Sequence, residues 1–374
     1  MRAAVCREFG TPLSVETVAL AAVGPGDVHV ELAACAVCHS DIHFVQGAWG
    51  GQLPAVYGHE AAGTVTAVGP QVSDVAVGDH VVVTLIRSCG ECHQCHRGNE
   101  VFCTTPFAAD ESPRLTDDDG PVLAAMNCGA FAEEVVVDRS QVVVVPNDLD
   151  WSVASLLACG VITGVGAVTN TSSANAASTV VVVGVGGVGL NTVQGAAIVG
   201  APVIVAVDLA QEKLEVARAF GATHVATPDN VREVIAVATG SAAGVSHVFV
   251  TVGSAPAIKA ALTYLEPGGE LVIVGMPAVG NEIEVDPVDI AASGQRIIGS
   301  KMGTSQIQHD IPRLIDWYRE GKLKLDELVS GTFSLDEINE AIAGVGDGSV
   351  IRNVVLLSGA DAGTSAAPDG GTDA

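Results

Sequence analysis

The chain has 374 residues, 48% of them hydrophobic and 16% charged, and its formal net charge is −26. This length and apolar content predict a folded protein with a substantial core and more than one domain, and they exclude a disordered chain. The negative charge repels nucleic-acid phosphates and anionic lipid head groups, so neither nucleic acid nor a membrane is an expected partner.

The N-terminal sequence and the cysteine content indicate the compartment. The opening residues MRAAVCREFG lack the basic-then-apolar pattern of a signal peptide. No unbroken apolar run reaches the roughly 18 residues of a membrane-spanning helix, so we expect none. Nine cysteines in a chain without a secretion signal favour metal binding or catalysis over disulfides. We therefore expect a cytoplasmic protein.

The first part of the chain, residues 1–160, is expected to be rich in short strands. The runs VHVELAACAV, AAGTVTAVG and DHVVVTLI are rich in β-branched residues, and Gly-Pro and Gly-Asp pairs stand between them. Such runs bounded by turn residues are typical of strands. The pattern predicts a β-rich domain.

From about residue 178 the pattern changes to strands that alternate with helices. STVVVVG and APVIVAVD have the composition of buried strands, GLNTVQGAAIVGA and LAQEKLEVARAFGA that of helices, and HVFVTVG and GELVIVG add further strands. This alternation predicts a doubly wound parallel sheet, an α/β fold, over residues 161–300. Residues 301–358 have no sheet of their own and are expected to pack back on one of the two domains. Residues 359–374 contain no large apolar side chain and are expected to be disordered.

Four cysteines lie close together in one segment. Cys89, Cys92, Cys95 and Cys103 follow the spacing C-x2-C-x2-C-x7-C. Four thiolates satisfy the tetrahedral preference of zinc and leave no position for a substrate, so the spacing predicts a structural zinc site. An iron–sulfur cluster uses four thiolates as well, but Thr104 follows Cys103 where such a run usually has Pro. Four unconnected cysteines are the other alternative.

A glycine-rich turn after the first strand of the α/β part indicates a dinucleotide site. Gly184, Gly186 and Gly189 have the order G-x-G-x-x-G between a predicted strand and a predicted helix. Asp208 ends the next strand, where a carboxylate binds a ribose 2′-hydroxyl and repels the 2′-phosphate of NADP. The next basic residue is Lys213, so the pattern favours NAD. The alternative is a strand–helix turn that binds nothing.

A second set of metal-binding residue types is spread along the chain. Cys38 lies in ACAVCHSDIH, His59 in GHE and Cys159 in LLACGVITG. Singly, each is more often a small apolar residue or a hydrogen-bonded histidine. Together, two Cys and one His are a set that holds catalytic zinc and leaves one position open. Zinc lowers the pKa of a bound hydroxyl and nicotinamide accepts hydride, so the combination points to oxidation of an alcohol.

These motifs together resemble those of the zinc-dependent medium-chain alcohol dehydrogenases. CHSDIH, GHEAAG, the four-cysteine loop, ACGVITG, VVVGVGGVGLNTVQGA and VIRNVV occur in the order of that family. The resemblance covers about residues 1–357 and is strongest to the class III-related bacterial branch, which includes nicotinamide-retaining enzymes of actinobacteria. It implies a GroES-like β-rich catalytic domain interrupted by a Rossmann domain.

The resemblance also implies roles for individual residues. Cys38, His59 and Cys159 match the ligands of the catalytic zinc, and Asp41 and Glu60 match carboxylates that surround these ligands. Ser40 matches the hydroxyl that takes the substrate proton, and His43 the outer end of the relay that passes it through the nicotinamide ribose to solvent. The positions that match cofactor contacts are His39, Thr163, Gly184, Gly186, Gly187, Val188, Gly189, Asp208, Lys213 and Arg352.

Departures from the family pattern narrow the class of substrate that we expect. The segment GAWGGQLPAVYGHE lacks the acidic pair of glutathione-dependent formaldehyde dehydrogenases, and no Arg follows shortly after Cys103. Lys301 stands at a usually apolar position near the pocket mouth, where we expect it to point to solvent. We expect a zinc- and NAD-dependent alcohol dehydrogenase for primary or aromatic alcohols, with two zinc ions per subunit. The rivals are a thiol-dependent formaldehyde dehydrogenase acting on S-(hydroxymethyl)glutathione, a zinc-free quinone reductase and a non-catalytic cofactor-binding protein. The expected assembly is a homodimer, with a tetramer as the alternative.

Overall fold

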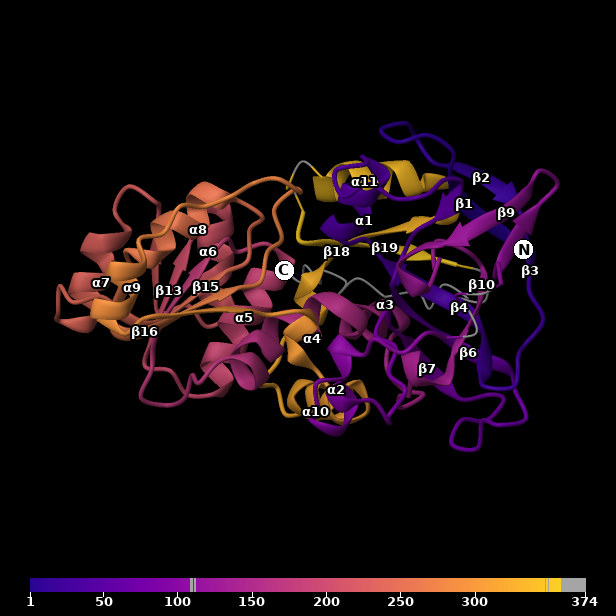
Figure 1. Ribbon diagram of the computed structural model, residues 1–374, viewed down its shortest axis with the longest axis horizontal. Helices are drawn as coiled ribbons and strands as arrows, with labels where there is room; N and C mark the ends of the chain where they lie inside the picture. Colours follow the sequence, from indigo (N-terminus) through magenta and orange to yellow (C-terminus); the bar gives the residue numbers. More distant parts are fainter. Residues whose placement is uncertain (108–109, 111, 347, 349, 358–374) are drawn as a thin grey trace, which may run out of the picture.

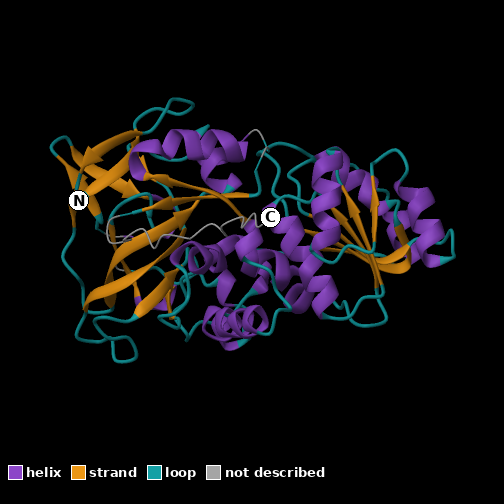
Figure 2. Ribbon diagram, turned by 180° about the vertical axis from the view of Figure 1, so that it is seen from behind, coloured by secondary structure: helices purple, strands orange, loops and turns teal. Residues whose placement is uncertain are grey.

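The computed structural model has two lobes, and it describes residues 1–374 apart from 108–109, 111, 347, 349 and 358–374 (Figure 1). One lobe is built mainly of strands from the N-terminal part of the chain. The other holds a sheet flanked by helices (Figure 2). The expected disordered tail, 359–374, lies outside the described residues.

Two sheets form the β-rich lobe. The larger has seven strands, in the order β11-β7-β6-β4-β19-β18 with β10 beside β4. Its strands are β4 (Asp27–Ala36), β6 (Glu60–Val68), β7 (His80–Val83), β10 (Glu134–Asp138), β11 (Val142–Val144), β18 (Val329–Ser334) and β19 (Arg352–Leu356). The second has the order β2-β1-β5-β9-β8-β3. Its strands are β1 (Arg2–Cys6), β2 (Ser14–Thr17), β3 (Ala19–Leu20), β5 (Ala55–Val56), β8 (Leu115–Asp117) and β9 (Gly120–Ala124).

The other lobe is a parallel six-stranded sheet in the order β14-β13-β12-β15-β16-β17. Its strands are β12 (Thr179–Val183), β13 (Val203–Val207), β14 (His224–Ala226), β15 (Val245–Val250), β16 (Leu265–Ile273) and β17 (Arg296–Gly299). Its helices are α5 (Gly187–Ile198), α6 (Gln211–Ala219), α7 (Val231–Thr239), α8 (Ala255–Leu262) and α9 (Pro287–Ser293). The central strands are valine-rich and buried on both faces, as parallel strands covered by helices require. The predicted fold class, a GroES-like lobe plus a Rossmann sheet, is confirmed.

One long apolar helix joins the lobes. It runs over Trp151–Thr171 as α3 (Trp151–Leu156), the π-turn η5 (Leu157–Val161), α4 (Ile162–Gly166) and a second π-turn, η6 (Ala167–Thr171). By length and composition it could cross a membrane, but 89% of its most apolar window is buried in the protein. Its first part packs on β4 and β6 and its later part on α5. The domain boundary predicted at 160/161 falls inside this helix.

The segment after the Rossmann sheet returns to the β-rich lobe. A tight turn, η7 (Met302–Thr304), leads into α10 (Ile307–Arg319), and α11 (Ile338–Gly346) lies between β18 and β19. Strand β19 pairs antiparallel with β4, and Asn353 accepts a backbone hydrogen bond from Val37 at 2.9 Å. A strand from the end of the described chain therefore completes a sheet built mainly from the N-terminal part of the chain. Short helices occupy the connections: α1 (His39–Val45), α2 (His93–His96), η1 (Glu100–Phe102), η3 (Ala125–Asn127), η4 (Arg139–Gln141), η8 (Asp326–Leu328) and η9 (Leu335–Glu337).

Candidate active site and zinc centre

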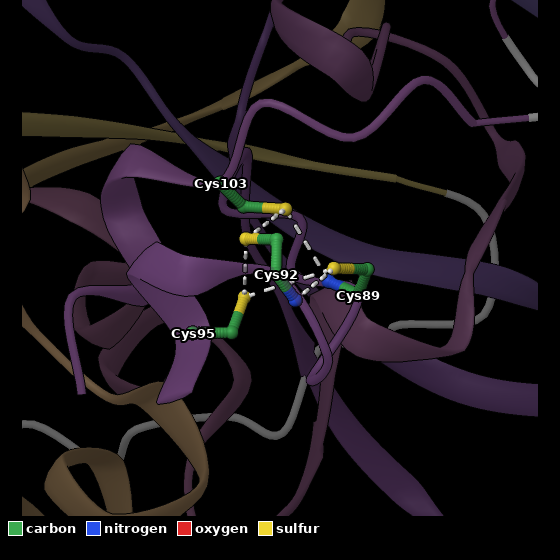
Figure 3. Close-up of side chains that lie close together, drawn as sticks. All are labelled: Cys89, Cys92, Cys95 and Cys103. Carbon is green, nitrogen blue, oxygen red and sulfur yellow. Dashed lines mark hydrogen bonds between the residues drawn. The ribbon is translucent and has the colours of Figure 1, made fainter. Parts of the chain in front are cut away.

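The four clustered cysteines point their sulfurs toward a common centre (Figure 3). The Sγ atom of Cys92 lies 3.5 Å from that of Cys95 and 3.9 Å from that of Cys103, and Cys89 lies 3.9 Å from Cys95. Four sulfurs at zinc–sulfur distances around one tetrahedral ion are about 3.8 Å apart. All four cysteines are free thiols. The spacing therefore fits a single zinc ion.

Hydrogen-bond donors around this loop favour thiolates. The backbone amide of Cys92 donates to the Cys89 sulfur at 3.2 Å, and the amide of Cys89 donates to Cys103 at 3.4 Å. The Thr105 hydroxyl donates to Cys89 at 3.0 Å and lowers the pKa of that thiol to about 6. Because zinc binds the thiolate form, these donors prepare the loop for the ion.

A second donor set is assembled from three distant segments. Cys38 caps the start of α1, His59 precedes β6, and Cys159 lies in the π-turn η5. Together with Glu60, their ligand atoms all lie within 4.8 Å of one another, and all four residues are buried. Two thiols and an imidazole in this arrangement form a donor set that suits zinc.

Asp41 fixes the orientation of the imidazole in this set. Its Oδ1 lies 3.0 Å from His59 Nδ1, and Nε2 of the same ring is buried without a hydrogen-bond partner in the described part of the chain. The carboxylate also accepts from the amides of Cys38, at 2.9 Å, and Gly58, at 3.0 Å. Such a carboxylate holds the ring so that the free nitrogen faces a metal. A buried nitrogen without a hydrogen-bond partner beside two thiols fits a metal ligand.

The charges of the set favour a cation. A hydrogen bond from Cys159 and the proximity of His59 and Arg352 lower the pKa of Cys38 well below its ordinary value. Burial alone would lower the pKa of His59, but Asp41 and Cys38 raise it well above its ordinary value. The negative charges of Asp41 and Cys38 thus favour a positive charge at His59, which a metal cation held by these donors would supply.

Glu60 and Arg352 are buried side by side beside the donors. Arg352 Nη2 lies 3.7 Å from Glu60 Oε1, and neither Glu60 carboxylate oxygen has a hydrogen bond to any residue that the structure describes. Burial raises the pKa of Glu60 to about 8, against the lowering effect of Arg352. A Cβ atom on Gly160 would lie 2.3 Å from Arg352 Nη2, and one on Gly187 would lie 2.7 Å from its Nε. The guanidinium therefore lies between the helix that carries Cys159 and the glycine-rich turn.

Helix α1 carries the polar residues next to the donors. Ser40 and His43 lie three positions apart, hence on one face of α1, and both side chains are half-buried. The Trp49 ring lies 4.8 Å from the His43 ring, and its indole nitrogen donates to Pro277 O in the Rossmann lobe at 3.3 Å. His39 begins the helix and is exposed.

The glycine-rich turn has the geometry that a phosphate-binding loop needs. Gly184 has φ +87°, a left-handed conformation that favours glycine. A Cβ on Gly189 would lie 1.9 Å from Gly184 O, so the close approach of helix and strand requires glycine there. A Cβ on Gly186 would meet nothing within 4 Å, and this residue caps the N-terminus of α5. The turn thus leaves open space where the helix amides can bind an anion.

The other predicted cofactor contacts surround this turn. Asp208 accepts from the amide of Val185 at 2.9 Å and from that of Ala210 at 3.1 Å, which holds its carboxylate at the end of β13. Lys213 has no ion-pair partner among the residues described. Thr163 and Val188 belong to neighbouring segments, since a Cβ on Gly164 would lie 2.4 Å from Val188 O.

Some residues that lie at the site were identified by no sequence motif. Met302 Sδ lies 3.7 Å from both Cys159 Sγ and Thr163 Oγ1, although it is 143 residues from Cys159. Trp49 lies in the loop after α1, and its ring contacts that of His43; no motif predicts the course of this loop. Lys301, expected to point to solvent, is exposed overall, but its ammonium donates to Val101 O at 2.7 Å and the side chain lines a cavity.

Comparison with known families agrees with this geometry. The model of the "Alcohol dehydrogenase GroES-like domain" matches residues 24–147, and that of the "Zinc-binding dehydrogenase" matches residues 187–320. The S-(hydroxymethyl)glutathione dehydrogenase of Paracoccus denitrificans is 34% identical over 95% of this chain and 99% of its own length. The chain belongs to the zinc-dependent medium-chain alcohol dehydrogenases.

Two further relatives place this alcohol dehydrogenase within the family. The class-3 alcohol dehydrogenase of Cereibacter sphaeroides is 34% identical over 95% of this chain and 99% of its own. The benzyl alcohol dehydrogenase structure from Acinetobacter calcoaceticus superposes with a TM-score of 0.88 at 30% identity, covering 96% of this chain and 99% of the other. The chain is therefore a class III-related, NAD-dependent zinc oxidoreductase acting on alcohols, and the predicted enzyme class and cofactors are confirmed.

Proposed function

We propose that this alcohol dehydrogenase reversibly oxidises primary or aromatic alcohols to aldehydes, with catalytic zinc at Cys38, His59 and Cys159. The observation that carries the proposal is the convergence of these buried donors within 4.8 Å, with Arg352 linking them to the glycine-rich turn. A structural zinc ion at Cys89, Cys92, Cys95 and Cys103 would be the second of two zinc ions in each subunit.

When bound, zinc supplies a Lewis acid for the alcohol oxygen and NAD supplies the hydride acceptor. The chain's own residues then handle the proton and the geometry. Ser40 Oγ would accept the hydroxyl proton and release its own proton toward the nicotinamide ribose, and half-buried His43, on the same face of α1, would take up the released proton near solvent. Asp41 keeps His59 in one orientation, and Trp49 covers His43 and excludes water from one side of it.

The proposed test is an activity screen with metal analysis on the same sample. Primary and aromatic alcohols should reduce NAD, and about two zinc ions per chain should be found, one for each donor cluster. A quinone reductase or a non-catalytic protein predicts no alcohol turnover. Absence of turnover over the whole panel in protein that holds both ions would contradict the proposal.

We propose that the glycine-rich turn and its surroundings hold NAD. Gly184, Gly186, Gly187, Val188 and Gly189 face the dinucleotide, His39 and Arg352 its pyrophosphate, Thr163 its nicotinamide, and Asp208 and Lys213 its adenosine ribose. The open space at Gly186 and the held Asp208 carboxylate support this arrangement.

Asp208 is expected to set the preference for NAD over NADP. In Asp208→Asn, the ratio of kcat/KM for NAD to that for NADP should fall at least about tenfold, because the charge that repels the 2′-phosphate is lost. The amide can still accept from Val185, so the turn keeps its shape. Steady-state kinetics with both cofactors measure this, and an unchanged ratio would remove Asp208 from the ribose site.

A thiol-dependent formaldehyde dehydrogenase is the second candidate, because a relative at 34% identity bears that name. Two observations weigh against it. The segment between Cys38 and His59 lacks an acidic pair, and the next arginine after Cys103 in the sequence, Arg114, is held by Asp27 at 2.7 and 2.8 Å. Formaldehyde oxidation with and without glutathione separates the two candidates.

We further propose a homodimer in the cytoplasm. The nine cysteines are free thiols, which suits a reducing compartment. A dimer is the family default for the spacing between Cys103 and Cys159, and light scattering would distinguish it from a tetramer.

A further inference from the structure

Helix α5, which follows the glycine-rich turn, carries two amide side chains in the interior of the protein. Asn191 and Gln194 are 1% and 2% exposed, and most residues of this helix are buried. A buried amide costs free energy unless it is hydrogen-bonded, whereas an apolar side chain in the same place avoids that cost. The proposed cofactor contacts use neither amide, so their hydrogen-bond partners indicate their role.

The side-chain amide of Gln194 binds both polar groups of the Lys324 backbone. Its Oε1 accepts from the Lys324 amide at 2.6 Å, and its Nε2 donates to Lys324 O at 3.1 Å. Leu323 and Leu325, on either side, are buried in the core. The Lys324 ammonium donates to Ala219 O, at the end of α6, at 2.8 Å. The segment between α10 and β18 is therefore fixed to two helices of the Rossmann lobe.

The same amide is linked to the glycine-rich turn through Asn191. Gln194 Nε2 also donates to Asn191 Oδ1 at 3.1 Å, and Asn191 Nδ2 donates to Gly187 O at 2.8 Å; both bonds are buried. The turn is held from within the Rossmann lobe as well, where the Thr251 hydroxyl donates to Gly184 O at 2.7 Å. The Asn191–Gln194 pair differs from that contact because it leads to the segment that returns to the β-rich lobe.

This segment leads along the chain to Arg352. Lys324 lies shortly before β18, whose first residue, Val329, pairs with Arg352 in β19. A Cβ on Gly187 would lie 2.7 Å from Arg352 Nε. The hydrogen bonds of Gln194, the chain up to β18 and the pairing of β18 with β19 thus form a closed ring that returns to the turn. Because buried hydrogen-bond networks are rigid, this ring sets how far the guanidinium lies from the turn.

We propose that Gln194 and Asn191 are positioning residues for the cofactor, which set the distance between the glycine-rich turn and Arg352 and thereby the affinity for the pyrophosphate. This inference rests on the proposed NAD site. A pyrophosphate bound there meets helix amides of one lobe and a guanidinium of the other, and such charge-assisted hydrogen bonds depend steeply on distance and angle. Both amides are buried, so they act through the turn and not by contact with the cofactor.

The competing explanation is a purely structural role, in which Gln194 only satisfies the buried backbone of Lys324. In that case, removing the amide lowers the stability of the fold, and the folded enzyme binds NAD as before. In a positioning role, the affinity also falls for every ligand that contains the pyrophosphate, and a ligand without the pyrophosphate keeps its affinity.

The test is calorimetric titration of the zinc-loaded enzyme with NAD, ADP-ribose and adenosine. Gln194→Met keeps the length of the side chain and removes its hydrogen bonds. It should weaken the binding of NAD and ADP-ribose by about tenfold and leave that of adenosine unchanged. Asn191→Leu breaks the link to the turn and keeps the contact with Lys324, so it should weaken the same two ligands. This second variant decides the question if the first fails to fold.

The matched control is Gln141→Met, the same change at another buried glutamine. Gln141 Nε2 donates to Thr84 O at 2.8 Å and to Asn127 O at 3.0 Å, all within the β-rich lobe. The control should lower the midpoint of thermal unfolding as Gln194→Met does, without a change in the affinity for NAD, ADP-ribose or adenosine. An equal loss of NAD affinity in the control, or a loss of adenosine affinity in Gln194→Met, would contradict the positioning role.

A further variant separates failure of this inference from failure of the proposed NAD site. In Gly186→Ala the new Cβ meets no protein atom within 4 Å, but it fills the space proposed for the phosphates, so NAD and ADP-ribose should bind more weakly. If Gly186→Ala weakens them and Gln194→Met does not, the positioning role is wrong although the NAD site stands. If Gly186→Ala has no effect, the NAD site and this inference both fail.

Discussion

Replacing Cys38 by alanine is expected to lower kcat/KM for alcohols by at least about a thousandfold. The thiolate is one of the donors of the buried set with His59 and Cys159, and a Lewis acid at this place contributes several kcal/mol to the stabilisation of the alkoxide. Steady-state kinetics and metal analysis of the same sample should show that turnover and one of two zinc ions are lost together.

The control for this variant is Cys6→Ala, the same change at another fully buried cysteine, which lies in β1 and belongs to neither donor cluster. It should keep both ions and near-normal activity. Circular dichroism should show that both variants keep the fold. Normal turnover in Cys38→Ala would refute the assignment of the catalytic ligands.

Replacing Cys95 by alanine is expected to act on stability first. The sulfurs of this loop lie at mutual distances that fit one ion, and little apolar packing holds α2, which has no buried residue. Losing the metal link should cost about 3 to 5 kcal/mol and lower the midpoint of thermal unfolding by several degrees. Differential scanning calorimetry and zinc content measure the effect.

His96→Ala, at the exposed neighbouring position on α2, is the matched control and should leave zinc content and unfolding unchanged. Cys103 and Thr105 of this loop line a cavity together with Lys301, and the next residue, Met302, contacts Cys159, so Cys95→Ala should lower activity secondarily. A variant that keeps two zinc ions and the wild-type unfolding midpoint would show that Cys95 is not a ligand.

Local sequence patterns predicted the features that depend on neighbouring residues. The run VHVELAACAV corresponds to β4. The order of the glycines predicted where α5 begins, because Gly184 has a positive φ and Gly189 lies too close to Gly184 O for a side chain. The spacing of the four cysteines predicted their convergence, because one short loop can wrap one ion.

Contacts between distant segments could not be predicted in this way. The family resemblance named Arg352 as a cofactor contact, but only the fold reveals its slot between Gly160 and Gly187 beside Glu60. Met302 reaches Cys159 because a strained turn packs against a helix far away in the sequence. No pattern within either segment contains that information, since packing of the whole chain decides it.

The π-turn at Leu157–Val161 limits insertions and deletions in this part of the enzyme's sequence. Each residue of a helix advances the side-chain direction by about 100°, so the number of residues before Cys159 determines where its sulfur points. Conservative substitutions upstream leave this count unchanged, whereas deleting a single residue there would turn the thiol away from Cys38 and His59. Related sequences should therefore exchange one apolar residue for another along this buried stretch of the helix, yet share its length.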